Sequence, residues 1–168
     1  MLIIGAASRQ EIEAHAERGF PREVCGFLLG RVEGTARRVD RVRPVRNAWE
    51  DSPRLRSSLF EHRQATSGDK PSRAEWEAAS EERRFLIDPR DYADADREAS
   101  AAGLAIIGFY HSHPNHPAIP SRFDRDMAMP EQSYVIVSVQ EGHAVDFRSW
   151  QVADFDTEFA EEAIDPCP

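Results

Sequence analysis

The feature that most constrains the fold of this sequence is a pair of histidines that directly follows a buried strand. The segment Leu104–Tyr110 is a continuous apolar run of strand length, which predicts a strand in the centre of a sheet. His111 and His113 come next, and side chains two residues apart on a strand point to the same face. Because neutral imidazoles are common metal ligands, these two side chains can converge on one ion at the end of the central strand.

A carboxylate follows the histidines after a short, proline-rich loop. If the chain turns back, Asp124 can reach the same ion, and two imidazoles with one carboxylate leave a fourth position open, as in catalytic zinc sites. The segment from Ser121 to Asp124 is also a capping box for a helix through Met127, which would hold Asp124 in a fixed direction. Taken alone, a His-x-His pair is more often two ordinary surface or core histidines.

The rest of the sequence predicts a single α/β domain with several buried strands. Ser8 is a candidate N-cap and Gly19 a candidate stop for the first helix, and Asp88 with Pro89 forms a strong helix start. The acidic end, with Phe155, Phe159 and Ala163 at spacings of four, predicts a short docking helix. The predicted elements are helices at 8–18 and 89–102 and strands near 25–30, 36–46, 104–110, 134–139 and 145–152.

The segment 49–83 differs in composition from its surroundings. It is rich in charged residues, Ser, Pro and Gly, and it has no apolar periodicity strong enough to seed a core. Partial helix formation is expected around Arg73–Glu82. We interpret the segment as a charged surface insertion, for which a lid, an exosite and a disordered loop are all open, and its composition favours the disordered loop.

Composition excludes several classes of protein. With 30 acidic against 21 basic residues the formal net charge is −9, which opposes nucleic-acid binding and suits a partner with a basic face. Cys25 and Cys167 do not form a disulfide framework, and Cys25 is interpreted as a small buried hydrophobe. The start is too short for a signal sequence and no stretch is long and apolar enough to span a membrane, so we expect a cytoplasmic protein.

An upstream string makes the histidine motif far more specific. Glu23-Val-Cys-Gly-Phe-Leu-Leu-Gly30 precedes it, and seven residues separate His113 from Ser121-x-x-Asp124. This arrangement resembles the JAMM (MPN-plus, Mov34/MPN/PAD-1) family of zinc isopeptidases, most closely its small prokaryotic members. The resemblance extends to Phe85-x-Ile-Asp-Pro and to the run at 133–139. It implies the JAMM/MPN (cytidine-deaminase-like) fold, with a mixed, curved β-sheet flanked by a helix on each side.

The resemblance also implies roles for individual residues. His111, His113 and Asp124 correspond to the ligands of one Zn²⁺ per chain, with water as the fourth ligand. Glu23 corresponds to the catalytic glutamate that assists attack by the zinc-bound water, and Ser121 to the serine that stabilises the tetrahedral intermediate. An isolated glutamate after a proline turn would otherwise be interpreted as a solvated charge, and it is the surrounding string that favours the catalytic role.

Family members cleave after the C-terminal Gly-Gly of a ubiquitin-like or sulfur-carrier protein, and release a conjugated lysine, a short peptide or an amino acid such as cysteine. We therefore expect such a carrier as the partner, a catalytic domain over 1–152 and an acidic tail over 153–168. The main alternative is a non-catalytic MPN-type interaction module, although such modules usually lack a ligand.

Three further alternatives fit less well. His116 gives the motif some likeness to metallo-β-lactamase-like hydrolases, but only His143 follows downstream. Zinc deaminases carry His-x-Glu with Pro-Cys-x-x-Cys, and neither string is present. A DNA-repair relative of the same fold is disfavoured by the net charge.

Overall fold

One mixed sheet organises the chain. The computed structural model describes residues 1–66, 72–80, 82–155 and 157–167, and within these ranges eight strands pair in the order β7-β6-β5-β4-β2-β3-β1-β8. The strands are β1 (Leu2–Gly5), β2 (Cys25–Glu33), β3 (Ala36–Val45), β4 (Ala105–Pro114), β5 (Ser133–Gln140), β6 (His143–Gln151), β7 (Ala160–Glu162) and β8 (Ile164–Cys167). The helices are α1 (Ala6–Gly19), α2 (Pro53–Thr66), α3 (Arg73–Ala78), α4 (Pro89–Ala101) and α5 (Arg122–Met127).

Strand β4 lies in the middle of this sheet and carries both histidines. It pairs antiparallel with β2 and parallel with β5, and all its residues from Ile107 to Pro114 are buried. The predicted central strand is confirmed, but it continues beyond Tyr110 through the histidine pair. His111 and His113 are therefore held by the backbone ladder itself.

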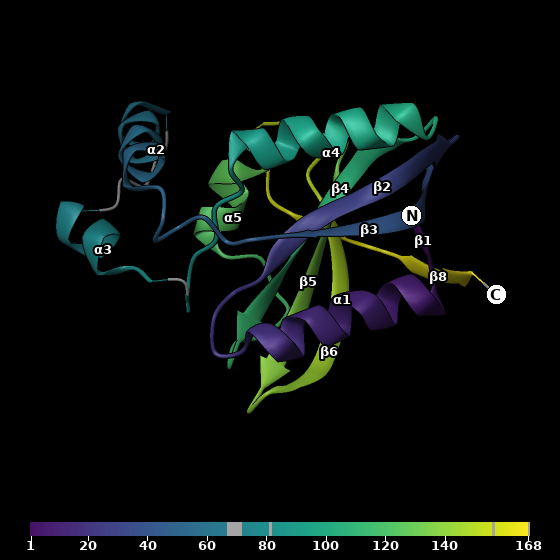
Figure 1. Ribbon diagram of the computed structural model, residues 1–168, viewed down its shortest axis with the longest axis horizontal. Coiled ribbons are helices and arrows are strands. Elements are labelled where there is room, and N and C mark those ends of the chain that lie inside the picture. Colours follow the sequence, from purple (N-terminus) through teal and green to yellow (C-terminus); the bar gives the residue numbers. More distant parts are fainter. Residues whose placement is uncertain (67–71, 81, 156, 168) are drawn as a thin grey trace.

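A helix covers each face of the sheet, as predicted (Figure 1). On one face, Ile12 and Ala16 of α1 pack into a cluster with residues of β1, β4 and β5. On the other, Ala95 and Ala99 of α4 pack against aromatic residues of β2, β4 and β5. Because α1 begins at Ala6 after Gly5, the prediction that Ser8 caps it is wrong.

The start of α4 was predicted correctly. The Asp88 carboxylate accepts a hydrogen bond from the backbone N–H of Arg90, and Pro89 occupies the first turn. The helix ends at Ala101, one residue before the predicted end.

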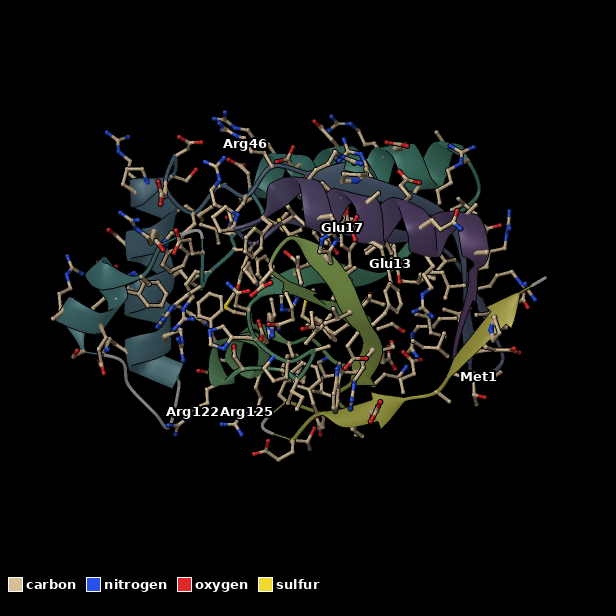
Figure 2. The ribbon with its side chains drawn as sticks, turned by 90° about the horizontal axis from the view of Figure 1, so that it is seen from below. Met1, Glu13, Glu17, Arg46, Arg122 and Arg125 are labelled. Carbon is tan, nitrogen blue, oxygen red and sulfur yellow. The ribbon has the colours of Figure 1, made fainter. Side chains whose placement is uncertain are left out.

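The C-terminal segment forms strands, so the predicted docking helix is wrong. Strand β7 pairs antiparallel with β6, and β8 pairs parallel with β1. The two edges of the sheet offer unpaired backbone groups, which an extended segment can satisfy and a helix cannot. The buried carboxylate of Glu162 also lies 3.1 Å from the amino group of Met1. Figure 2 shows Met1 beside the C-terminal strand.

The described part of the segment 49–83 has its own small core and is not a disordered loop. Helices α2 and α3 lie at one end of the molecule, beside α5 (Figure 1), and α3 confirms the helix expected near Arg73–Glu82. Residues 67–71 and 81 lie outside the described residues. The core, here called the second core, consists of Ala48, Trp49, Trp76, Leu86 and Phe123, with Leu55, Leu59, Phe60 and Ala79 packed against it. Its apolar residues are few and come from segments that are distant in the sequence. They therefore form no periodic pattern from which the second core could be predicted.

No helix in the described ranges combines the length and the apolar composition that a membrane span requires.

Candidate metal centre

Three side chains from β4 and α5 converge on one point. The Nε2 atoms of His111 and His113 are 3.0 Å apart. His111 Nε2 lies 3.3 Å from Oδ1 of Asp124, and His113 Nε2 lies 3.6 Å from its Oδ2. All three residues are buried. The structure thus brings together the three ligands that the sequence predicts.

The spacing of these atoms fits a small tetrahedral ion. Zinc binds nitrogen and oxygen ligands at about 2.0–2.1 Å, so two ligand atoms of a tetrahedral site lie roughly 3.3 Å apart. The observed separations of 3.0, 3.3 and 3.6 Å fall around that value. Two imidazoles and a carboxylate are also a donor set that zinc accepts, so His111, His113 and Asp124 fit the metal that the family implies.

Neighbouring groups hold each of the three side chains in place. His113 Nδ1 lies 2.8 Å from the carbonyl oxygen of Pro117, so a proton on Nδ1 leaves Nε2 free to bind a metal. The ring of Phe85 stacks on that of His111 at 4.5 Å. The predicted capping box is present, because the Ser121 N–H donates to Asp124 Oδ2 at 2.6 Å and the Asp124 N–H donates to Ser121 Oγ at 3.2 Å.

The protonation tendencies of Asp124 and His111 suit metal binding. Burial would raise the pKa of Asp124, but the two histidines outweigh it and hold that pKa well below its usual range. Burial lowers the pKa of His111 despite the opposing effect of Asp124. Burial also acts to lower the pKa of His113, yet its hydrogen bond to Asp124 raises it. The carboxylate is therefore ionised, and His111 favours the neutral form that binds metals.

Glu23 lies in the loop just before β2, close to the three ligands. It is only 8% exposed, and burial raises its pKa to about 8, although the nearby His113 and Arg84 act to lower it. The middle residue of the histidine motif fixes this loop, because Ser112 Oγ accepts a hydrogen bond from the Val24 N–H at 3.0 Å and the Ser112 N–H donates to the Val24 carbonyl. A buried carboxyl with a pKa near neutrality is suited to proton transfer.

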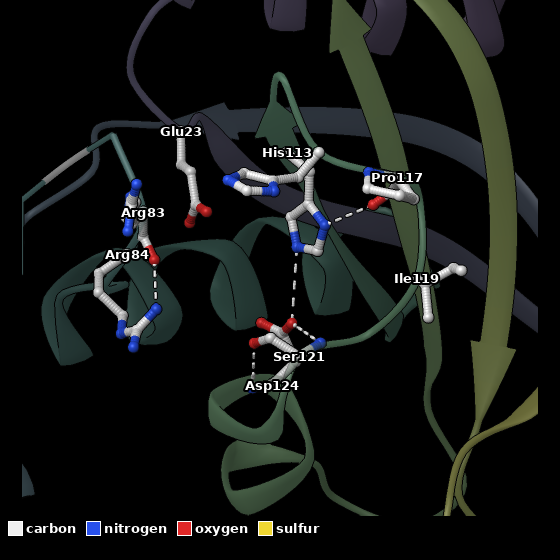
Figure 3. Close-up of a pocket in the computed structure, with 9 residues that line it drawn as sticks. Glu23, Arg83, Arg84, His113, Pro117, Ile119, Ser121 and Asp124 are labelled. Atoms are coloured by element: carbon white, nitrogen blue, oxygen red, sulfur yellow. Dashed lines mark hydrogen bonds and ion pairs between the residues drawn. The ribbon is translucent and has the colours of Figure 1, made fainter. Parts of the chain in front are cut away.

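Glu23, His113 and Asp124 open onto a cavity of about 470 Å³ (Figure 3). Its lining combines four of the predicted site residues with two arginines at and just after the end of the segment 49–83, and with the loop after β4. The lining residues are Glu23, Arg83, Arg84, His113, His116, Pro117, Ile119, Ser121 and Asp124.

The metal-binding group offers no support for the metallo-β-lactamase-like alternative. Among the described residues, it contains neither His116 nor His143. His116 lines the cavity without belonging to that group.

Asn47, which sequence reasoning missed, connects the Glu23 loop to the segment before α4. Its buried side-chain amide donates to the carbonyl oxygens of Glu23 at 3.1 Å and Arg84 at 2.8 Å. Its oxygen accepts from the N–H groups of Trp49 and Leu86. An asparagine after a strand is a common turn residue, so the sequence carries no signal for this role. The sequence likewise carries no signal for the contacts of Ser112 and Phe85, because the fold alone brings these residues to their partners.

Comparisons with known proteins agree with this geometry. A family model described as prokaryotic homologs of the JAB domain matches residues 5–153. The chain is 32% identical over 155 residues to a CysO-cysteine peptidase of Mycobacterium tuberculosis, covering 92% of this chain and 84% of that protein. It is 30% identical over 142 residues to a desampylase of Haloferax volcanii, covering 82% and 80%. A solution structure from Desulfitobacterium hafniense superimposes with a TM-score of 0.72 at 27% identity, covering 99% of this chain and 93% of that one.

Proposed function

Because this chain belongs to the family of prokaryotic homologs of the JAB domain, we propose that it is a zinc-dependent peptidase of the JAMM type. It hydrolyses the peptide or isopeptide bond after the C-terminal Gly-Gly of a ubiquitin-like or sulfur-carrier protein. The named relatives, a CysO-cysteine peptidase and a desampylase, support this reaction class. The cytoplasmic location stays a prediction.

One observation carries the proposal: a buried glutamate lines the same cavity as His113 and Asp124, two of the three clustered candidate metal ligands. His111, His113 and Asp124 would hold the zinc. When bound, zinc lowers the pKa of a coordinated water to about 7 and polarises a carbonyl oxygen. An interaction module without catalysis has no need for a buried carboxyl beside such a group, because burying it costs stability.

We assign proton transfer to Glu23. In the metal-free protein, burial raises the pKa of this carboxyl, which favours the proton uptake that the role requires. In the reaction it takes a proton from the attacking water and passes it to the departing amine. The loop contacts of Ser112 and Asn47 keep the carboxyl at the cavity wall.

Ser121 is assigned to the developing oxyanion. Its Oγ accepts the backbone N–H of Asp124, which leaves its O–H proton free to donate into the cavity that the residue lines. Loss of one such donor typically lowers the rate by about 10²–10³-fold.

The test compares Glu23→Gln with the wild type, both loaded with zinc, on carrier proteins extended past Gly-Gly. We expect the variant to lose about 10²–10⁴-fold in rate, since it keeps the shape of the side chain but cannot transfer a proton. Glu11→Gln, an exposed position on α1, is the matched control and should cleave normally. Equal turnover by Glu23→Gln and wild type would remove Glu23 from the mechanism.

Metal analysis of the purified protein separates the enzyme from the interaction module. One zinc per chain, or full restoration on adding zinc, is expected of the enzyme. A smaller content that added zinc does not restore would favour the module.

A further inference from the structure

Two consecutive arginines, Arg83 and Arg84, line the cavity beside the candidate metal centre. Figure 3 shows them on the side of the cavity opposite Pro117 and Ile119. Arg83 is the last residue of the segment 49–83 and Arg84 follows it, and the mechanism above gives them no role. A positive charge next to a metal site weakens cation binding, so these residues call for a different ligand.

Several contacts hold the Arg84 side chain in one place. Its guanidinium lies over the ring of Phe123, 5.0 Å from the centroid, and one of its terminal nitrogens donates to the Arg83 carbonyl oxygen at 2.6 Å. Its own carbonyl accepts from the Asn47 amide. The guanidinium is thus stacked and oriented before any substrate arrives, which reduces the entropy lost on binding.

This guanidinium also has unused hydrogen-bonding capacity. Among the described residues, its buried Nε–H group has no hydrogen-bond partner. It interacts electrostatically with Glu23 and Asp124, and burial lowers its pKa. A buried donor without a partner is costly, and a planar fork of N–H groups is the geometry that binds a carboxylate.

The chemistry of the cleaved bond indicates which carboxylate can reach this position. If the group released is a single amino acid, its α-carboxylate is attached to the carbon that bears the scissile nitrogen, only a few bonds from the reacting carbonyl. If it is a lysine of a protein conjugate, the nitrogen is attached to an apolar chain with no charge nearby. An arginine close to both Glu23 and a metal ligand therefore distinguishes the two leaving groups.

We propose that Arg84, assisted by Arg83, binds the free α-carboxylate of an amino acid attached after Gly-Gly, so that the preferred substrate is a carrier protein extended by one amino acid. The inference rests on the proposed function and names its leaving group. Water adds its oxygen to the glycine carbonyl carbon, the carbon–nitrogen bond breaks, and the amine leaves with the proton that Glu23 delivers. Charge-assisted pairing should favour this substrate by about 10- to 100-fold in kcat/KM.

The experiment uses two substrates that differ only in charge. One is a carrier protein extended past Gly-Gly by alanine with a free carboxylate, and the other is the same protein ending in alanine amide. Alanine avoids a thiol that would bind the metal. Both are cleaved with zinc-loaded wild type, Arg84→Met, Arg84→Lys and Arg83→Met, with Arg41→Met as the control because Arg41 is exposed on β3 and does not line the cavity.

The expected results are specific to the carboxylate. Wild type and Arg41→Met should prefer the carboxylate by about 10- to 100-fold, Arg84→Met should cleave the two substrates at nearly equal rates, and Arg84→Lys should restore part of the preference. Arg83→Met should give a smaller loss. Binding of the carboxylate substrate to Glu23→Gln, measured by calorimetry, should weaken by a similar factor when Arg84→Met is added.

Three outcomes would overturn the inference. Equal cleavage of both substrates by wild type would refute it while leaving the proposed function intact. An equal loss on both substrates in Arg84→Met would assign Arg84 a structural role only. If wild type cleaved neither these substrates nor lysine-linked conjugates, the proposed function itself would fail, and the inference with it.

Discussion

The candidate metal centre is built from two regions that hold their residues by different means. His111 and His113 sit on β4, where backbone hydrogen bonds to β2 and β5 fix them from both sides. Asp124 sits on α5, a helix of six residues, which is too short to be stable alone. The first region owes its geometry to the sheet, and the second needs outside support.

That support comes from the second core. Phe123, next to Asp124 in the chain, packs against Trp49 and Trp76. The buried side chain of Arg63 on α2 pairs with Asp126 on α5 and lies over the Phe123 ring. The comparison teaches that the segment 49–83 is part of the site's framework, because it holds the helix that carries the third ligand.

The largest expected effect comes from removing a ligand in either region. His113→Ala in the sheet and Asp124→Asn in the helix should each lower activity by roughly 10³-fold or more, since the metal's chemistry is lost in both cases. Zinc content per chain and turnover of a Gly-Gly-extended carrier are the measurements. If one variant kept both its zinc and its activity, the two regions would not share one site.

A second variant weakens the second core, which holds α5, without touching the strands that hold the histidines. Trp76→Ala empties part of the second core, at a cost of about 3–5 kcal/mol for a core tryptophan, and should loosen α5. We expect zinc affinity, measured by competition with a chelator, to fall about tenfold, as when a group that orients a ligand is lost. The thermal midpoint should fall as well, so the effect specific to this variant is the loss of zinc affinity in the folded protein.

Ile12→Ala is the matched control for that variant. Ile12 is fully buried in the core between α1 and the sheet, away from the metal centre. It should lower the thermal midpoint by several degrees without altering zinc affinity in the folded protein. If Trp76→Ala and Ile12→Ala changed zinc affinity and thermal midpoint in the same proportion, the second core would not hold the candidate metal centre in place any more than the main core does.

The contrast between the regions also explains how much could be predicted from the sequence. The ligand set was recognisable because its members lie within one short segment whose spacing the chemistry constrains, and the caps of α4 and α5 are equally local signals. Glu23 was predicted only through the resemblance of the segment Glu23–Gly30 to the family.

What could not be predicted depends on contacts between distant residues. The second core joins Trp49, Trp76 and Phe123. Asn47 bridges the backbone of Glu23 and Arg84. Neither set of contacts produces a periodic pattern in the sequence. The C-terminal strands were missed for a related reason. Their conformation is set by the edges of the sheet rather than by the spacing of their own aromatic residues.

The smallest predicted effect concerns two carboxyl groups, one from each region, whose pKa values shift in opposite directions. Burial raises the pKa of Glu23 to about 8, whereas the histidines hold the pKa of Asp124 well below its usual range. In the metal-free protein, ionised Asp124 therefore stabilises the fold at neutral pH, and ionised Glu23 opposes it. The substitution Glu23→Gln should remove this destabilising charge.

The sign of the Glu23 effect follows from proton uptake. Between its ordinary pKa of 4.5 and the folded value of about 8, the folded protein keeps the proton on Glu23 and the unfolded chain releases it, so wild-type stability falls as pH rises. Relative to wild type, Glu23→Gln should gain stability as the pH rises from 5 to 8, by several degrees in thermal midpoint. Thermal unfolding with a chelator present measures this gain, and Glu11→Gln should show none. If the difference in thermal midpoint between Glu23→Gln and wild type were the same at all pH values, Glu23 would already be ionised in the folded, metal-free protein. Burial of its carboxyl would then not destabilise the fold.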